Sequence, residues 1–402
     1  MNISNLPQRV CDLLARGVHM PNPASVHVDD SIVPQRIAPD VVIHPGCRLS
    51  GGRTSIGPGC KIGAEAPVTL EDSQLGAGVE IRGGYISGAV FLDGASLGSG
   101  AHVRPGTLLE EQASGAHAVG LKQTILMPYV TLGSLINFCD VLMAGGTSRK
   151  NHGEVGSSFV HFNFTPHQDK ATPSLIGDVP RGVFLDQKPI FLGGQGGLVG
   201  PSRIGYGCVT PAGTVFRGDA PGEDLLLISP APPAGARPYQ TGVYRGSGRI
   251  LKNNLIYLGN IRALLAWYRH VRVRFMSGFY TRFCWEGAVA QLASVEQERF
   301  KRLEEWVGKL RASAEALRER GDTAEAEVQE SIVNRWPRIR ERLLTSFDDS
   351  RLREAFLQAA DGALGTASYI DWAPNLPDTA KAAGRAWLQA IVDATASAAA
   401  EP

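Results

Sequence analysis

Three histidines, His152, His161 and His167, lie close together near the middle of this 402-residue chain. An imidazole titrates near neutral pH, and a positioned histidine is the side chain most often used as a general base. A carboxylate from Glu154 or Asp169 would orient the ring. Two alternatives stay open, because the histidines also fit an exposed loop or, with Asp169, a metal site. We expect proton-transfer chemistry here and predict no metal ion.

The elements that must position these side chains repeat every six residues. Between positions 190 and 217, aliphatic residues recur at Leu192, Leu198 and Ile204. This spacing matches neither the period of a helix nor that of one long strand. It is typical of a hexapeptide β-helix, in which the chain turns a corner after each short strand and each coil buries its inner face against the next. The same rhythm begins near Val26, and it predicts a β-solenoid.

A change in composition divides the chain. Glycines are concentrated in the first 220 residues, whereas amphipathic helical periodicity appears beyond residue 245. A stretch rich in proline lies between the two regions and indicates a linker. We therefore predict a capping helix and lead-in at 1–24, a β-helix at 25–228, a Pro/Gly linker at 229–244 and an α-helical domain at 245–402.

Charge and cysteine content set broad limits on function. The net charge of +1 gives no general argument for binding nucleic acid or membranes, and we predict no nucleic-acid partner. The six cysteines show no metal-type spacing, which favours a reduced, intracellular protein. The sequence shows no basic-then-apolar leader and no run of the ~18 apolar residues that a membrane span needs. We expect a cytoplasmic protein.

The segment 245–282 is basic and aromatic and contains no acidic residue. Such a segment could contact a membrane surface or an anionic partner. The favoured interpretation is packing against the acidic helices predicted downstream, between Glu296 and Glu330.

Several blocks of the chain then resemble a known family. The matching residues are Leu13–Val18, Pro23–Asp29, the Arg-Pro-Gly motif in Val103–Thr107, and the coils of Ile190–Arg217. They are similar to the C-terminal half of the bifunctional bacterial N-acetylglucosamine-1-phosphate uridyltransferase / glucosamine-1-phosphate acetyltransferase. The resemblance covers about residues 8–230, and the family's uridyltransferase domain is expected to have no counterpart here. It implies a left-handed parallel β-helix, a rare exception to right-handed crossovers, and a homotrimer with acyl transfer at the seams between subunits.

The resemblance assigns substrate roles to four residues. Arg104 and Lys122 correspond to the family's Arg and Lys, which hold the phosphate of the amino sugar. A guanidinium suits bidentate phosphate binding, and an ammonium adds a second point charge. Asn163 corresponds to an Asn that touches both the sugar and the acyl group, and Phe164 replaces a Tyr while keeping an aromatic wall.

Three further positions depart from the family pattern. Ser134 stands where the catalytic His is expected, Asn137 replaces the sugar-binding Tyr, and Glu154 replaces a second Asn. An unassisted serine hydroxyl is no general base near neutral pH. One of the three clustered histidines is therefore the hypothesised base. On a strand, His161 and Asn163 would share one face and could point at the same seam.

Acetyl-CoA or another acyl-CoA is the donor that the resemblance implies. The family holds it with backbone groups of the last coils, and Gly194 and Ala212 correspond to two of these positions. A cofactor-binding Lys of the family falls near Lys170.

The sequence thus predicts an acyltransferase-like protein acting on a sugar phosphate or nucleotide sugar, as in the UDP-N-acetylglucosamine pathway. Two alternatives stay open: a non-catalytic trimer that binds the sugar phosphate or serves as a scaffold, and a partner of a separate nucleotidyltransferase.

Overall fold

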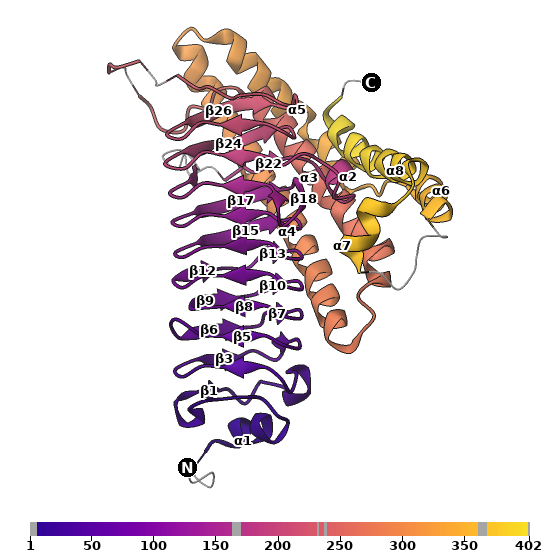
Figure 1. Ribbon diagram of the computed structural model, residues 1–402. Helices are drawn as coiled ribbons and strands as arrows, with labels where there is room; N and C mark the ends of the chain where they lie inside the picture. The colour runs from indigo at the N-terminus through magenta and orange to yellow at the C-terminus, as the bar shows by residue number, and fades with distance from the viewer. Residues whose placement is uncertain (1–5, 163–169, 231–232, 237–238, 361–367, 401–402) are drawn as a thin grey trace.

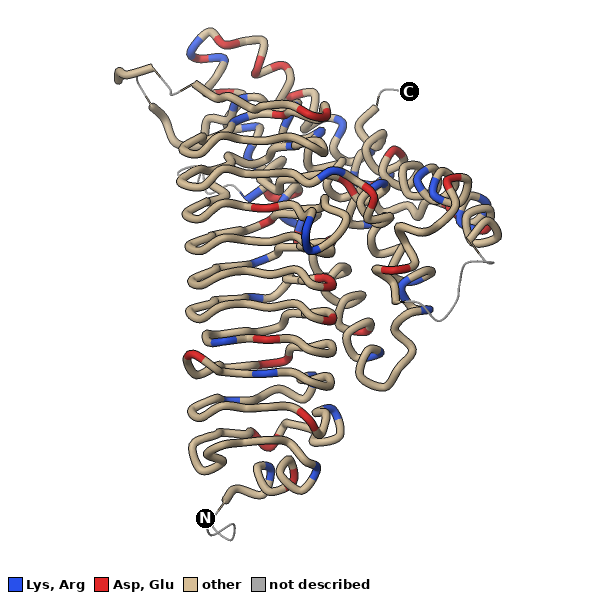
Figure 2. The backbone as a smooth tube through the Cα atoms, in the orientation of Figure 1, with Lys and Arg blue, Asp and Glu red and all other residues tan. Residues whose placement is uncertain are grey.

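The computed structural model describes residues 6–162, 170–230, 233–236, 239–360 and 368–400. The described residues from α1 (Gln8–Ala15) to β26 (Val215–Ala220) form an upright column of stacked coils, and the helices from α3 (Ser247–His270) onward lie along one side of it (Figure 1). This confirms the predicted fold class, a parallel β-solenoid followed by an α-helical region. Charged residues are sparser along the column than along the helices (Figure 2).

A short helix closes the N-terminal end of the column. Helix α1 (Gln8–Ala15) buries Val10 and Leu13 and packs beside the first strand, β1 (His27–Val28). It ends before Gly17, whose φ of 98° suits a left-handed stop that glycine adopts without a Cβ penalty. The helix therefore covers the apolar interior of the first coil, as the end of a solenoid requires.

The column has three flat faces, each made of parallel strands from successive coils. Face 1 consists of β2 (Val42–Ile43), β5 (Lys61–Ile62), β8 (Glu80–Ile81), β11 (Ser96–Leu97), β14 (Ser114–Gly115), β16 (Thr131–Leu132), β20 (Glu154–Val155), β23 (Phe191–Leu192) and β25 (Val209–Thr210).

Face 2 follows face 1 in each coil. It consists of β1 (His27–Val28), β3 (Arg48–Ser50), β6 (Val68–Glu71), β9 (Gly84–Ser87), β12 (Ala101–Val103), β21 (Val160–Phe162) and the first halves of β15 (Gly120–Leu126), β17 (Asn137–Met143), β24 (Gly197–Ile204) and β26 (Val215–Ala220).

Face 3 completes the coil. It consists of β4 (Ser55–Ile56), β7 (Gln74–Leu75), β10 (Ala89–Phe91), β13 (Thr107–Leu109), β22 (Ser174–Ile176) and the second halves of β15, β17, β24 and β26. A hairpin, β18 (Gly146–Ser148) with β19 (Asn151–His152), leaves the column between faces 3 and 1.

The interior is a stack of aliphatic and aromatic side chains in register. On face 2, Val103 pairs with Leu121 and Leu121 pairs with Phe138, so each inward side chain lies on the one from the coil below. These three residues are at most 1% exposed. Burying a large apolar side chain stabilises a protein by roughly 1.5–3 kcal/mol. The six-residue rhythm therefore fixes which side chains point inward and which point outward.

The helical region covers face 3. Helix α4 (Phe279–Glu319) lies against β4, β7, β10 and β13, and α3 (Ser247–His270) lies against β22 and β24. Helix α2 (Val179–Gly182) is inserted between the solenoid strands β22 and β23. Further helices of the C-terminal region are α5 (Thr323–Leu344), α6 (Ser350–Ala360), α7 (Tyr369–Trp372) and α8 (Asp378–Ala396). Within the described ranges, no helix is both long enough and apolar enough to cross a membrane.

The basic and aromatic segment 245–282 lies mostly inside this region. Trp267 and Tyr268 are fully buried, and Trp267 packs against Phe184 of the solenoid with ring centroids 5.4 Å apart. Arg262 forms an ion pair with Glu296 of α4 at 2.7 Å. These contacts agree with the favoured interpretation, in which the segment packs against an acidic helix.

Candidate functional site

Two cations lie side by side at the end of face 2. Val103 pairs with Leu121, so the next residues, Arg104 and Lys122, occupy neighbouring positions on adjacent coils, and the Arg104 N–H donates to the Leu121 carbonyl at 2.9 Å. Across the described ranges, neither side chain forms an ion pair. Adjacent like charges are unfavourable, so this arrangement favours an anionic ligand that bridges both.

The coil above extends the polar surface. Cys139 pairs with Lys122 and Asn137 with Gly120, which places both residues on the same outward face. The Nη2 atom of Arg104 lies 3.9 Å from the Sγ of Cys139. Burial raises the pKa of the Cys139 thiol above its usual value, against the opposing effect of the two cations. We call Arg104, Lys122, Asn137 and Cys139 the face-2 patch.

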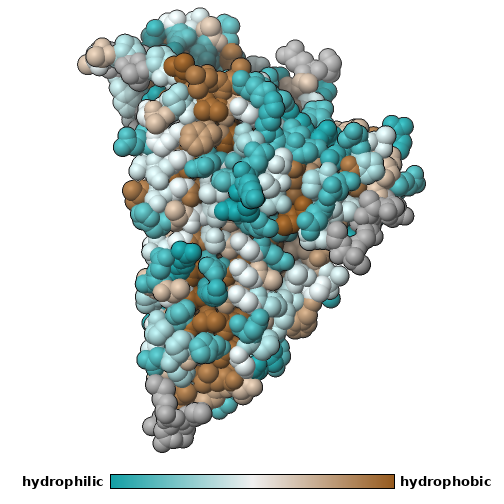
Figure 3. Space-filling model, in the orientation of Figure 1, coloured by the Kyte–Doolittle hydropathy of each residue, from teal (hydrophilic) through white to brown (hydrophobic). Residues whose placement is uncertain are grey.

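Aromatic and apolar side chains border the patch. Phe162 is 43% exposed on face 2, two residues after Val160, which pairs with Asn137. Leu135 is 54% exposed at the corner that precedes Asn137. Apolar surface also shows over the upper coils, where β24 and β26 lie (Figure 3). The sequence predicts an aromatic wall from Phe164, which lies outside the described residues, whereas Phe162 supplies one that the sequence reasoning missed.

The corner between faces 1 and 2 repeats one turn in successive coils. Backbone hydrogen bonds link the turns vertically: the Leu135 N–H donates to the His117 carbonyl at 3.1 Å, and the Ser158 N–H donates to the Ser134 carbonyl at 2.8 Å. Leu135 and Ser158 both have a φ near 60°. We call this column of turns the corner ladder, and it places His117 directly below Ser134.

A serine and a histidine meet on the corner ladder. The Ser134 Oγ lies 2.8 Å from the His117 Nδ1, and the Ser134 N–H donates to the Ser157 Oγ at 3.1 Å. His117 is exposed and Ser134 is half-buried. The sequence reasoning missed His117. His117 occupies in its coil the corner position that Ser134 occupies in the next, and only the vertical register of the coils shows this match.

The two backbone positions predicted to hold an acyl-CoA also lie on the corner ladder. Gly194 follows Ser157 in the column, and the Gly213 N–H, next to Ala212, donates to the Gly194 carbonyl at 2.8 Å. A Cβ at Gly194 would lie 2.7 Å from the Ser157 carbonyl oxygen, so the close stacking of these turns requires glycine. The structure therefore brings Ser134, Gly194 and Ala212 to one edge, beside the face-2 patch.

Other predicted residues lie elsewhere. His152 and Glu154 do approach each other, with Nε2 3.7 Å from Oε2, but they lie at the entry to face 1, and Glu154 pairs with Thr131 and Phe191 on that face. Lys170 is exposed, and its carbonyl accepts a hydrogen bond from Arg299. Asn163, Phe164 and His167 lie outside the described residues.

His161 faces the interior rather than a seam between subunits, which differs from the expectation based on strand parity. Its Nδ1 lies 2.6 Å from the Cys139 carbonyl, and its Nε2 lies 2.8 Å from the Ser174 Oγ. Burial lowers the pKa of His161 to about 4. Both ring nitrogens are occupied within the fold, so His161 is not placed to take a proton from a ligand on face 2.

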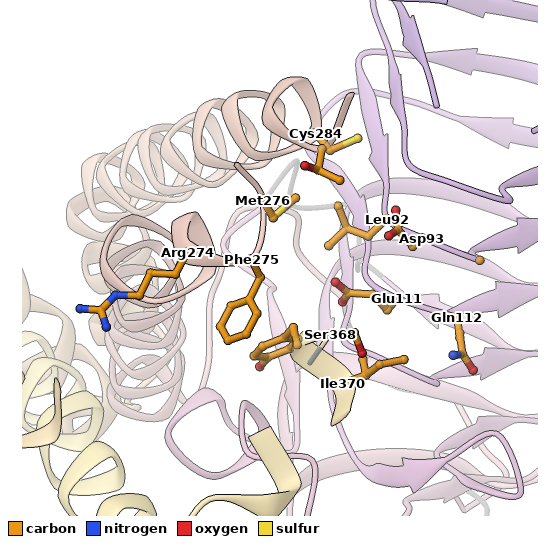
Figure 4. Close-up of a pocket in the computed structure, with 13 residues that line it drawn as sticks. Leu92, Asp93, Glu111, Gln112, Arg274, Phe275, Met276, Cys284, Ser368 and Ile370 are labelled. Atoms are coloured by element: carbon orange, nitrogen blue, oxygen red, sulfur yellow. The ribbon is translucent and has the colours of Figure 1, made fainter. Parts of the chain in front are cut away.

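A separate cavity of about 450 Å³ lies between the column and the helices (Figure 4). It opens where the coil turns from face 3 to face 1, away from the face-2 patch. Its lining includes Leu92, Asp93, Glu111, Phe275, Met276 and Cys284. The Glu111 carboxylate also pairs with the buried Arg272. Of the predicted site residues that the structure describes, none lines this cavity.

The coils, the corner ladder and the outward cations define a hexapeptide-repeat β-solenoid that carries two adjacent cations on face 2. No family model matches the chain. The bifunctional protein GlmU of Pelobacter propionicus is 28% identical over 217 residues, which covers 54% of this chain and 42% of that protein. The proteins of the same name from Thermotoga petrophila and Thermus thermophilus are 29% and 31% identical, over 55% and 48% of this chain and 44% and 37% of theirs.

The chain therefore spans less than half the length of these curated relatives. The similarity, together with the β-solenoid, confirms the resemblance that the motifs indicate.

Proposed function

We propose that this protein is an acyltransferase that binds a sugar phosphate or nucleotide sugar on the face-2 patch. The observation that carries the proposal is the adjacent pair Arg104 and Lys122, which has no carboxylate partner in the described structure. A guanidinium and an ammonium on neighbouring coils complement the negative charge that a phosphate distributes over its oxygen atoms. Asn137, one coil above, offers an amide to a sugar hydroxyl.

The donor in this proposal is acetyl-CoA or another acyl-CoA, held along the corner ladder. Gly194 and Ala212 present backbone groups there, and Leu135 adds exposed apolar surface for the acyl chain. The corner lies at the edge of face 2, so a donor on it would meet an acceptor on the patch. A homotrimer would close this edge against a neighbouring column, as the resemblance implies.

A non-catalytic sugar-phosphate-binding trimer is the second candidate. Its support is Ser134, because serine stands at the position where the resemblance expects the general base. Both candidates require anion binding on the face-2 patch, and only the first requires release of a free thiol from acyl-CoA. Assistance to a separate nucleotidyltransferase would require neither thiol release nor turnover by this chain alone.

Calorimetry with glucosamine 1-phosphate and with UDP-N-acetylglucosamine tests the binding step. Arg104→Ala and Lys122→Ala should each weaken binding at least tenfold, since each removes a charge-assisted contact. Arg48→Ala is the matched control, because Arg48 lies exposed on the same face several coils below. Equal binding by all three variants would contradict the proposed site. Thiol release from acetyl-CoA in the presence of an amino sugar phosphate then separates the enzyme from the binding protein.

A further inference from the structure

We propose that His117 and Ser134 together replace the general base, with Ser134 contacting the acceptor and His117 receiving the proton through it. This inference rests on the proposed acyl transfer. It starts from the 2.8 Å contact between the Ser134 Oγ and the His117 Nδ1, which joins two adjacent coils on the corner ladder. A nucleophile or relay hydroxyl within hydrogen-bond reach of an imidazole is the recurring geometry of an activated serine.

The backbone holds this contact in place. The ladder hydrogen bond from the Leu135 N–H to the His117 carbonyl fixes the spacing of the two turns, and the bond from the Ser134 N–H to the Ser157 Oγ fixes the serine from above. The interior side chains of both coils are fully packed. A pair mounted on stacked coils is more rigid than one on a long loop, and such rigidity is what proton transfer geometry requires.

The outer side of the pair is open to a ligand. His117 is exposed, and its Nε2 makes no hydrogen bond to any described residue. With the proton on Nε2, the Ser134 hydroxyl donates to Nδ1 and its lone pairs face outward. The corner ladder also carries Gly194 and Ala212, and Asn137 follows Ser134 by three residues at the start of the face-2 strand. The hydroxyl is therefore at the junction of the proposed donor and acceptor sites.

The proton and electron balance is complete within the proposed reaction. The acceptor nitrogen attacks the thioester carbonyl and forms the new N–C bond as it loses a proton to the Ser134 Oγ. The Ser134 hydroxyl proton moves at the same time to the His117 Nδ1, which leaves an imidazolium. Collapse of the tetrahedral intermediate breaks the C–S bond. The proton then returns from His117 through Ser134 to the thiolate, which leaves as a free thiol.

The other predicted bases with described positions do not offer this geometry. Both ring nitrogens of His161 are bonded inside the column, and His152 is turned toward Glu154 at face 1. Ser134 alone lacks the basicity that the step needs. The His117 contact supplies that basicity to the side chain at the position where the resemblance expects the base.

Steady-state kinetics on the full chain, with acetyl-CoA and an amino sugar phosphate, test the inference. His117→Ala and Ser134→Ala should each lower kcat at least 100-fold, the size of a general-base contribution, with KM for the sugar phosphate nearly unchanged. His44→Ala is the matched control, because His44 lies at the same corner several coils below. The decisive variant is the double substitution His117→Ala with Ser134→His, which puts an imidazole in the relay position and should recover much of the lost kcat.

The outcomes are separable. Normal turnover by His117→Ala would overturn the pair while leaving acyl transfer intact. A wild-type protein that binds the sugar phosphate but releases no thiol would overturn both the transfer reaction and the pair. A kcat loss in His117→Ala that Ser134→His fails to recover, together with a changed thermal midpoint, would show a structural role only. NMR tests the hydrogen bond without any turnover. We expect the His117 Nδ1 resonance of the wild type to lie upfield of the same resonance in Ser134→Ala.

Discussion

Faces 2 and 3 of the same column differ in whether their charged side chains are paired within the protein. On face 2, Arg104 and Lys122 point outward from adjacent coils with no acidic partner among the residues described. At the edge of face 3, Asp140 and Glu111 are nearly buried, and each pairs with an arginine of the helical region, Arg299 at 3.0 Å and Arg272 respectively. The first pattern suits a ligand and the second holds two parts of the chain together.

The difference shows how one repeating fold separates binding from docking. Every coil offers three outward faces with similar backbone geometry, so only the outward side chains distinguish them. Face 3 is closed by α3 and α4, and hydrogen bonds such as the one from the Gly106 N–H to the Gln291 Oε1 continue its edge into the helices. Face 2 stays outside that contact.

Arg299→Ala should lower the free energy of unfolding by about 3–5 kcal/mol, because it removes the ion pair that the guanidinium forms with the buried Asp140 carboxylate. Chemical denaturation measures this value. Arg318→Ala is the control, since it breaks the exposed ion pair with Glu330 and should cost less than about 1 kcal/mol. Equal losses in the two variants would mean that face 3 is not held by buried charge.

Glu110→Gln should change how stability depends on pH. Burial raises the pKa of Glu110 to about 7, while the Tyr268 hydroxyl donates to its Oε1 at 2.5 Å. A carboxyl whose folded pKa is raised stabilises the protein below its unfolded pKa near 4.5, and this contribution is lost as the pH rises through 7.

The wild type should therefore lose up to about 3 kcal/mol between pH 4.5 and 8 through this group, and Glu110→Gln should lose less. Thermal unfolding across that range measures the slope. Glu319→Gln, at an exposed position at the end of α4, serves as the control and should leave the slope nearly unchanged. Parallel profiles for the wild type and Glu110→Gln would contradict a neutral, buried Glu110.

Lys122→Ala should have the smallest effect on the ligand-free protein, within about 0.5 kcal/mol and toward greater stability, because it relieves the repulsion from Arg104. The stabilisation that a sugar phosphate gives the wild type should shrink in this variant. Differential scanning calorimetry with and without glucosamine 1-phosphate measures both quantities. A large loss of ligand-free stability would assign Lys122 a structural role and weaken the contrast between the two faces.

Much of the solenoid could be predicted from spacing alone. Leu192, Leu198 and Ile204 recur every six residues because each flat face repeats the same inward position, and all three are at most 2% exposed. The outward placement of Arg104 and Lys122 follows from the same rhythm. The parity of a short strand does not show which side of it faces the interior, and His161 points inward.

The amino-acid sequence by itself determined the repeating coil, the helical region that follows it and the outward cations, since these depend on residue types at local spacings. Tertiary structure alone decided that His117 lies under Ser134 and that α3 and α4 cover face 3. The first depends on the vertical register of the coils, which is set by the sum of all strand and corner lengths in each coil. The second depends on which coils a helix distant in the sequence contacts. Local residue preferences do not encode these sums, whereas packing of the interior side chains fixes them.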